Sequence, residues 1–185
     1  MAETEAEIVQ RAKQGDHAAF SLLFERYRRP VLGFLFGMTG RRDSTEDLLQ
    51  ETVSRAFALL PKLREESKFS TWLFGIARNV AREKGRKTLR DYAATDIETS
   101  GTDMFSDPRP DPETDAIRQQ LYRAIRKGFA VLDEDRRTAL VLRVLAEKRY
   151  QEIAAITGWS LARVKIEIHR ARIEMRKMME PYLRM

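Results

Sequence analysis

The sequence predicts an all-α protein of two small helical domains joined by an acidic flexible linker. Apolar residues recur at helical spacing along nearly the whole chain, and alternating strand patterns are almost absent. One segment breaks this pattern: residues 91–115 carry eight acidic residues against the single base Arg109, with three prolines among them. Because such a composition cannot bury a core, we expect an extended linker here. The domains are therefore expected at residues 1–90 and 116–185.

The composition limits the classes of function. Lys and Arg number 34 against 28 for Asp and Glu, and the resulting net charge of +6 favours a polyanionic partner such as nucleic acid. The absence of cysteine excludes disulfides and thiolate metal sites. His17 and His169 are far apart, and neither a phosphate-binding loop nor a dinucleotide-binding fingerprint is present. We expect no enzyme activity, no catalytic residue, no metal site and no cofactor.

Targeting and membrane signals are not evident in the sequence. Residues 1–7 are acidic and lack the apolar core of a signal peptide. The longest apolar run, residues 31–38, is too short to cross a bilayer. We therefore expect a cytoplasmic protein without membrane insertion.

Local signals predict the first helices. A short helix is expected over residues 2–14, followed by a break at which Asp16 caps the next helix. The apolar and aromatic stretch 18–37 contains Pro30, which is expected to end or kink the helix there. A turn is expected over residues 40–43.

The helix that begins at Ser44 and ends before Pro61 has two distinct faces. Its apolar stripe consists of Leu48, Leu49, Thr52, Val53, Ala56, Phe57 and Leu60. Asp47, Gln50 and Glu51 share the opposite face. Two carboxylates on adjacent turns could serve catalysis, metal binding or docking of a basic partner. Since no histidine or further acid completes a metal shell, docking or a plain solvated face is favoured.

The stretch 61–90 combines positive charge with aromatic residues. It holds nine basic and three acidic residues, and a helix is expected over residues 70–88. A basic surface with aromatic and amide side chains, here including Asn79, can hold single-stranded nucleic acid and receive unstacked bases. Trp72 lies on the apolar stripe and is expected in the core, whereas Phe69, in the preceding loop, is the freer aromatic.

The second domain ends in a predicted helix-turn-helix. A helix over residues 117–132 is followed by one capped by Asp133, with a buried stretch 139–145. A short helix over residues 150–157, a turn containing glycine and a long basic helix to about residue 179, capped by Ser160, are typical of a DNA-reading unit.

The long helix presents a candidate reading face. With Ile168 directed inward at 100° per residue, the most outward positions are Arg163, Ile166, Arg170 and Ile173. Arginines can contact guanine, Glu167 cytosine and Ile166 a thymine methyl group, while Lys165 and Arg172 suit phosphates. The alternative is a helical hairpin with a solvated basic face, but the outward isoleucines count against it.

In their order along the chain, these motifs resemble sigma factors of the extracytoplasmic-function (ECF) group of the bacterial sigma-70 family. The similarity to region two lies in Asp47-Leu48-Leu49-Gln50-Glu51, Arg55-Ala56-Phe57, Phe69-Ser70-Thr71-Trp72-Leu73 and Ile76-Ala77-Arg78-Asn79. The similarity to region four lies in Tyr150-Gln151-Glu152-Ile153-Ala154, Gly158, Val164-Lys165 and His169-Arg170-Ala171-Arg172.

The resemblance implies a transcription initiation factor that has core RNA polymerase, promoter DNA and an anti-sigma factor as partners. The residues that would bind the clamp helices of the polymerase large subunit are Asp47, Leu48, Gln50 and Glu51. Those that would engage and help melt the −10 element are Lys68, Phe69, Arg78, Asn79, Arg82 and Arg86. Those that would bind the −35 element are Arg163, Lys165, Ile166, Glu167, His169, Arg170 and Arg172. Region four would also meet the polymerase flap, and the linker would thread toward the RNA exit path.

The chain departs from the group's pattern at two places. Glu147, Lys148 and Arg149 replace the small or hydroxylated residues usual before the helix-turn-helix, and Ile166-Glu167 stands where Ser-Arg is common. Two other classes remain open: a self-sufficient helix-turn-helix regulator with an N-terminal sensor or dimerisation domain, and an RNA-binding protein. The acidic motif around Asp47 and the basic aromatic stretch after it favour the sigma factor.

Overall fold

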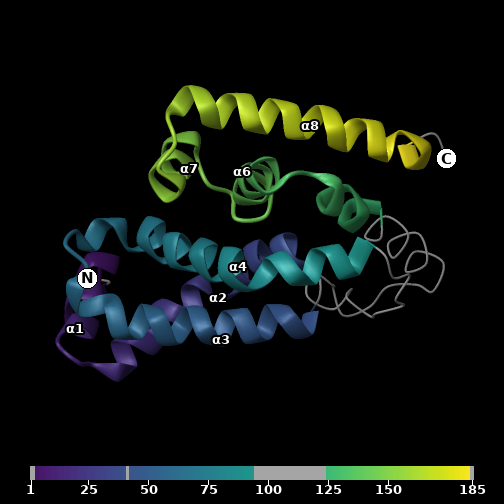
Figure 1. Cartoon of the computed structure of the whole chain (residues 1–185). Coiled ribbons are helices and arrows are strands. Elements are labelled where there is room, and N and C mark those ends of the chain that lie inside the picture. The colour runs from purple at the N-terminus through teal and green to yellow at the C-terminus, as the bar shows by residue number, and fades with distance from the viewer. Residues whose placement is uncertain (1–2, 41, 94–123, 184–185) are drawn as a thin grey trace.

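The computed structural model describes residues 3–40, 42–93 and 124–183, and this part of the chain is helical without any strand. The helices form two layers (Figure 1). The N-terminal layer consists of α1 Glu5–Lys13, α2 His17–Thr39, α3 Arg42–Leu59, the 3₁₀ turns η1 Leu60–Lys62 and η2 Glu66–Lys68, and α4 Phe69–Ala93. The C-terminal layer consists of a helical segment over 124–131, α6 Glu134–Val144, α7 Tyr150–Thr157 and α8 Leu161–Leu183. The predicted all-α class is confirmed.

α2 and α6 begin at the predicted capping residues Asp16 and Asp133, whereas α1 begins at a cap that was not predicted. Thr4 caps α1, and its backbone N–H donates to the Glu7 carboxylate at 2.7 Å in a capping box, so this helix begins later than expected. Asp16 caps α2 by accepting a hydrogen bond from the Ala19 N–H at 3.0 Å. Asp133 caps α6 in the same way through the Arg136 N–H at 2.9 Å.

Of the two outcomes expected at Pro30, the end of the helix does not occur, because α2 runs through this residue to Thr39. Proline removes one hydrogen bond from a helix, which costs about 3 kcal/mol in isolation. Buried residues on both sides of Pro30, among them Leu23, Val31 and Phe34, hold α2 against the other helices. Packing along the whole length of α2 therefore outweighs the local penalty.

α3 and α4 form a hairpin that carries the region with the strongest sequence signals. α3 ends at Leu59, and Pro61 lies in η1, as expected. Arg55 joins the two helices by donating to Glu51 on α3 and pairing with Glu83 on α4, both at 2.8 Å. The helix α4 extends to Ala93, beyond the expected start of the linker. The rest of that linker and the first part of the helix expected over 117–132 lie outside the described residues.

Several side chains expected in the core are partly exposed. Phe57 on α3 and Leu161 and Met178 on α8 each retain more than a third of their accessible surface. All three lie within the first or last two turns of their helices, and Phe57 still contacts Phe20 of α2 with the ring centres 5.1 Å apart. The central positions of the same stripes, such as Leu48 and Ile168, are buried as predicted.

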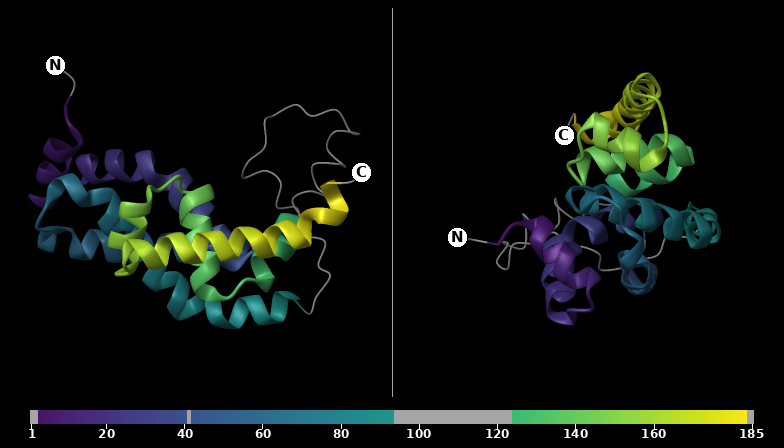
Figure 2. Two further views of the ribbon diagram at one scale, coloured as in Figure 1. Left: turned by 90° about the horizontal axis from the view of Figure 1, so that it is seen from above. Right: turned by 90° about the vertical axis from the view of Figure 1, so that its left-hand side faces the viewer.

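The two layers pack directly on each other through a continuous apolar core. α6 crosses α2 where Gly37 leaves no room for a Cβ: an added one would lie 2.7 Å from Val141 Cγ1. α7 lies against α4, and Figure 1 and the right-hand view of Figure 2 show the C-terminal helices on the α4 side of the bundle. The arrangement brings residues of the predicted DNA-binding surfaces to the boundary between the layers.

Candidate polymerase and nucleic-acid interfaces

The acidic face of α3, defined by Asp47, Gln50 and Glu51, is accessible as predicted for a docking surface. Asp47 and Gln50 are exposed, and Glu51 is half-buried because it accepts a hydrogen bond from Arg55. Leu48, which its spacing assigns to the apolar stripe and the family resemblance to the polymerase contact, is only 3% exposed and packs inside the bundle, so only the second expectation fails. That expectation is corrected: Leu48 can shape α3 but offers no contact surface. Among the described residues, no group of His, Cys, Asp or Glu could hold a metal ion.

The basic face of α4, defined by Arg78, Asn79 and Arg82, points toward the C-terminal layer. Asn79 is exposed, while Arg82 Nε donates to Glu134 Oε1 of α6 at 2.7 Å. Arg78 is half-buried, with its guanidinium carbon 5.7 Å from the centre of the Trp159 ring. Burial and, secondarily, the charge of Arg82 lower the pKa of Arg78.

The other residues assigned to the −10 element differ in accessibility. Lys68 is exposed and pairs with Glu65 at 2.7 Å. Arg86 lies on α4, but its side chain is outside the described part of the chain. Phe69 was expected to be the freer aromatic, and this is wrong: its side chain is fully buried. The reason is that Phe69 begins α4 and inserts its ring between Tyr27 and Trp72, at 5.5 and 5.7 Å between ring centres.

The helix-turn-helix forms with the predicted caps. Gly158 ends α7 in the left-handed conformation at φ 74°, and Ser160 Oγ accepts a hydrogen bond from the Arg163 N–H at 3.2 Å. The reading face of α8, defined by Arg163, Ile166, Arg170 and Ile173, is exposed along its length. Lys165, His169 and Arg172 beside it are exposed as well.

Glu167 is the exception on α8. Its side chain is only 14% exposed and lies 3.8 Å from Arg136 of α6 and 4.0 Å from Arg163. The assignment of Glu167 as a cytosine contact is therefore corrected for this arrangement, because the carboxylate is turned toward neighbouring arginines. The Glu167 carboxylate therefore attracts the guanidinium groups of Arg136 and Arg163 and helps to position them.

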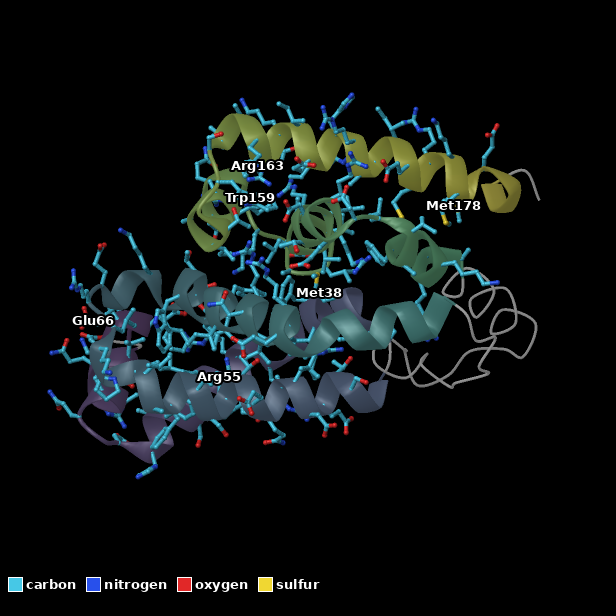
Figure 3. The ribbon with its side chains drawn as sticks, viewed as in Figure 1. Met38, Arg55, Glu66, Trp159, Arg163 and Met178 are labelled. Carbon is cyan, nitrogen blue, oxygen red and sulfur yellow. The ribbon has the colours of Figure 1, made fainter. Side chains whose placement is uncertain are left out.

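Four residues that the sequence did not single out complete the boundary between the layers. Trp159, in the turn before α8, lies between Arg78 of α4 and Arg163 of α8, whose guanidinium is 4.5 Å from the ring centre. Figure 3 shows Trp159 and Arg163 near the α7–α8 turn, on the side toward α4. Asp135 of α6 accepts a hydrogen bond from Arg163 at 2.6 Å. Asp135, Glu134 and Arg136 were missed because only the fold brings the start of α6 to both α4 and α8.

Comparison with protein families defines the class of this molecule. The description Sigma-70 region 2 matches residues 23–90, and Sigma-70, region 4 matches residues 118–175. The chain therefore belongs to the sigma-70 family of transcription initiation factors, and its relatives place it in the ECF type. None of the described helices is both long and apolar enough to cross a membrane.

The relatives extend over almost the whole chain. It is 33% identical to the ECF RNA polymerase sigma-E factor of Haemophilus influenzae, with 97% of each protein covered. It is 31% identical to the RNA polymerase sigma-H factor of Pseudomonas aeruginosa, covering 98% of this chain and 97% of that one.

Solved structures show the same fold. CnrH in complex with the cytosolic domain of CnrY superposes with a TM-score of 0.74 at 22% identity, covering 97% of this chain and 99% of CnrH. The sigma factor RpoE in complex with the anti-sigma factor NepR from Bartonella quintana gives a TM-score of 0.63 at 23% identity, covering 87% and 96%.

Proposed function

We propose that this sigma factor acts in the cytoplasm, docks on core RNA polymerase through the acidic face of α3, and directs it to promoters with two DNA-binding surfaces. The basic face of α4 would engage the −10 element, and the reading face of α8 the −35 element. The observation that carries the proposal is that two neighbouring helices, α3 and α4, expose side chains of opposite charge. α3 presents acids outward, while α4 presents bases on a different side of the same bundle.

Docking through α3 rests on charge complementarity with a basic partner. Asp47 is exposed, and a charge at the rim of an interface mainly changes the association rate and its salt dependence. In runoff transcription at limiting core polymerase, Asp47→Ala is expected to reduce product about fivefold. Glu25→Ala, an exposed acid on α2, is the control and should transcribe like the wild type. Promoter binding by the chain alone, with no gain on adding core, would contradict the proposal.

Contact with the opened −10 strand rests on the accessible amide of Asn79. An amide beside arginines can hydrogen-bond the edge of an unstacked base. Asn79→Ala is expected to weaken permanganate reactivity of −10 thymines in the complex with core, at unchanged affinity for core. The control Gln151→Ala removes an exposed amide from α7. Unchanged reactivity in Asn79→Ala would remove this residue from the −10 surface.

Contact with the −35 element rests on Arg170, which is exposed at the centre of the reading face. A bidentate arginine contact to a base contributes about 1–3 kcal/mol of discrimination. Arg170→Ala is therefore expected to lower activity on a promoter with its −35 element and to have little effect on one without it. An equal loss on both templates would show that Arg170 does not read bases.

We further propose an anti-sigma factor as the regulator. Ile166 and Ile173 are 48% and 44% exposed on the reading face, and a protein that covers them would also block −35 binding. Ile173→Asn is expected to weaken inhibition by a partner identified through pull-down from the host. The control Leu22→Asn changes an exposed apolar residue on α2. If the captured protein leaves runoff transcription unchanged, it is not the regulator.

A further inference from the structure

The start of α6 carries three consecutive acids, Asp133, Glu134 and Asp135, which we call the acidic cap. We propose that the acidic cap is an internal competitor for promoter phosphates, which holds the free chain closed until polymerase and DNA displace it. The inference rests on the proposed function, because it concerns access of DNA to the surfaces assigned above.

The acidic cap contacts both DNA-binding surfaces at once. Glu134 accepts a hydrogen bond from Arg82 on the basic face of α4, at 2.7 Å. Asp135 accepts one from Arg163 on the reading face of α8, at 2.6 Å. Carboxylate and phosphate oxygens present the same acceptor chemistry to a guanidinium. In the free chain, Arg82 and Arg163 are thus paired with carboxylates, whose oxygens resemble those of the DNA phosphates that the two arginines are proposed to bind.

The same closed arrangement covers further residues proposed to meet DNA. Arg78 is half-buried below Trp159, and its Nε has no hydrogen-bond partner. A guanidinium held away from water without full pairing is poorly satisfied in this state, so an alternative partner outside the chain can compete for it. A charged recess lies at this boundary, lined by Arg82, the acidic cap, Arg136 and Glu167.

A second contact between the layers is independent of the acidic cap. Lys148, from the loop before α7, is only 9% exposed. Its amine donates to Ser70 Oγ at 2.6 Å and lies 4.4 Å from the centre of the Phe74 ring, both on α4. Lys148 belongs to the stretch that departs from the ECF pattern. The chain therefore has its own means of holding region four on region two.

The ion pairs of the acidic cap are suited to a reversible contact. The paired side chains keep between 31% and 47% of their accessible surface, so water and salt screen their attraction. Binding of a polyanion or of a basic polymerase surface can then shift the equilibrium without a large barrier.

The test compares Glu134→Gln/Asp135→Asn with the control Glu147→Gln/Glu174→Gln. Both variants lose two negative charges from region four, but the control removes no ion pair with the described side chains of α4. Since the chain contains no cysteine, Ala58→Cys on α3 and Lys177→Cys on α8 provide sites for a donor and an acceptor dye. Energy transfer and binding to a short fluorescein-labelled duplex of mixed sequence are measured on the free protein at low and moderate salt.

The acidic cap variant is expected to lose energy transfer and to bind the duplex about fivefold more tightly than the control. Added salt should open the wild type and have less effect on the variant. Equal energy transfer in all proteins, or an equal gain of affinity in variant and control, would overturn the proposal. Runoff transcription by the wild type with core polymerase separates the outcomes. Its failure would count against the sigma function, whereas the difference in energy transfer between the variant and its control reports on the acidic cap.

Discussion

Arg137 is a buried arginine that completes the end of a neighbouring helix. Its Nε donates to the carbonyl of Phe129 at 2.6 Å, and its Nη2 donates to that of Leu132. Phe129 lies in the last turn of the helical segment 124–131 and Leu132 directly follows it, so neither carbonyl has an intrahelical donor. Burial lowers the pKa of Arg137, yet an arginine remains charged under these conditions. The buried guanidinium of Arg137 therefore supplies hydrogen-bond donors to backbone carbonyls that would otherwise be unpaired.

Replacement of Arg137 by Met should therefore leave buried carbonyls without a donor. We expect the free energy of unfolding, measured by urea denaturation, to fall by about 2–4 kcal/mol. The control Arg149→Met removes an exposed arginine near α7 and should change it by less than about 0.5 kcal/mol. A similar loss in both variants would mean that general charge, and not the carbonyl contacts, determines the effect.

Lys148 makes the closing of the two layers depend on pH. Burial lowers the pKa of its ammonium group, against smaller opposing effects of Glu152 and Glu5. The open state has an ordinary lysine, so it binds more protons than the closed state once the pH exceeds the lowered pKa. The closed state should therefore gain population as the pH rises toward the ordinary lysine value of about 10.4.

Energy transfer between the layers is therefore expected to increase as the pH rises from neutrality toward the ordinary lysine pKa. Tyr27, whose ring centre lies 5.9 Å from the Lys148 amine, stays protonated over this range because burial and its hydrogen bond to Glu5 raise its pKa. Lys148→Met removes the titrating amine and should abolish the increase. A decrease with pH in the wild type would contradict the sign of this linkage.

The turn between α7 and α8 depends on the left-handed backbone of Gly158. Its φ of 74° is one that side chains with a Cβ rarely adopt, although nothing lies within 4 Å of an added Cβ. Gly158→Ala is expected to lower the free energy of unfolding by about 1 kcal/mol. Gly75→Ala, in the interior of α4 with equal space, should raise it by up to about 1 kcal/mol. Thermal unfolding of both variants checks the opposite signs.

Elements whose signals are local could be predicted from the sequence. The bounds of α7, the end of α3 near Pro61 and the caps Asp133 and Ser160 depend on residues within a few positions of one another. Whether the helix ends at Pro30 or continues through it could not be decided from the sequence, because burial against distant helices decides it.

In the candidate interfaces too, features set by neighbouring residues could be predicted, whereas those set by contacts between distant residues could not. The outward direction of Arg170 follows from helix geometry alone and is confirmed. The burial of Phe69 depends on Tyr27, and the turning of Glu167 depends on Arg136 of α6. A single sequence contains no information about contacts between residues so far apart. The exposure predicted for the side chains of Phe69 and Glu167 was therefore wrong.

At the scale of the whole molecule, the two layers meet partly along the surfaces proposed to bind DNA. α2 and α6 form an apolar contact, while the acidic cap and Lys148 form polar ones. A tightly packed contact does not deform continuously but switches between two arrangements, here the two layers closed or open. One added atom that does not fit into the contact can therefore favour the open arrangement. Gly37 is the position where this can be tested without changing any charge.

Gly37→Ala is expected to open the molecule. Alanine favours a helix, so α2 itself should not be weakened. The added Cβ would lie 2.7 and 2.8 Å from the two methyl carbons of Val141, whose branched side chain has little rotamer freedom within α6. Energy transfer between the layers should fall, and affinity for mixed-sequence duplex should rise, as for the acidic cap variant.

Gly128→Ala is the matched control, because its Cβ would meet the sulfur and terminal methyl of Met175 at 2.6 and 2.8 Å. Methionine is unbranched and can swing aside, so this variant should stay closed. If Gly37→Ala retained the energy transfer of the wild type, the contact between α2 and α6 would be adaptable. In that case the polar contacts of α4 with Lys148 and the acidic cap would alone determine how the free chain closes.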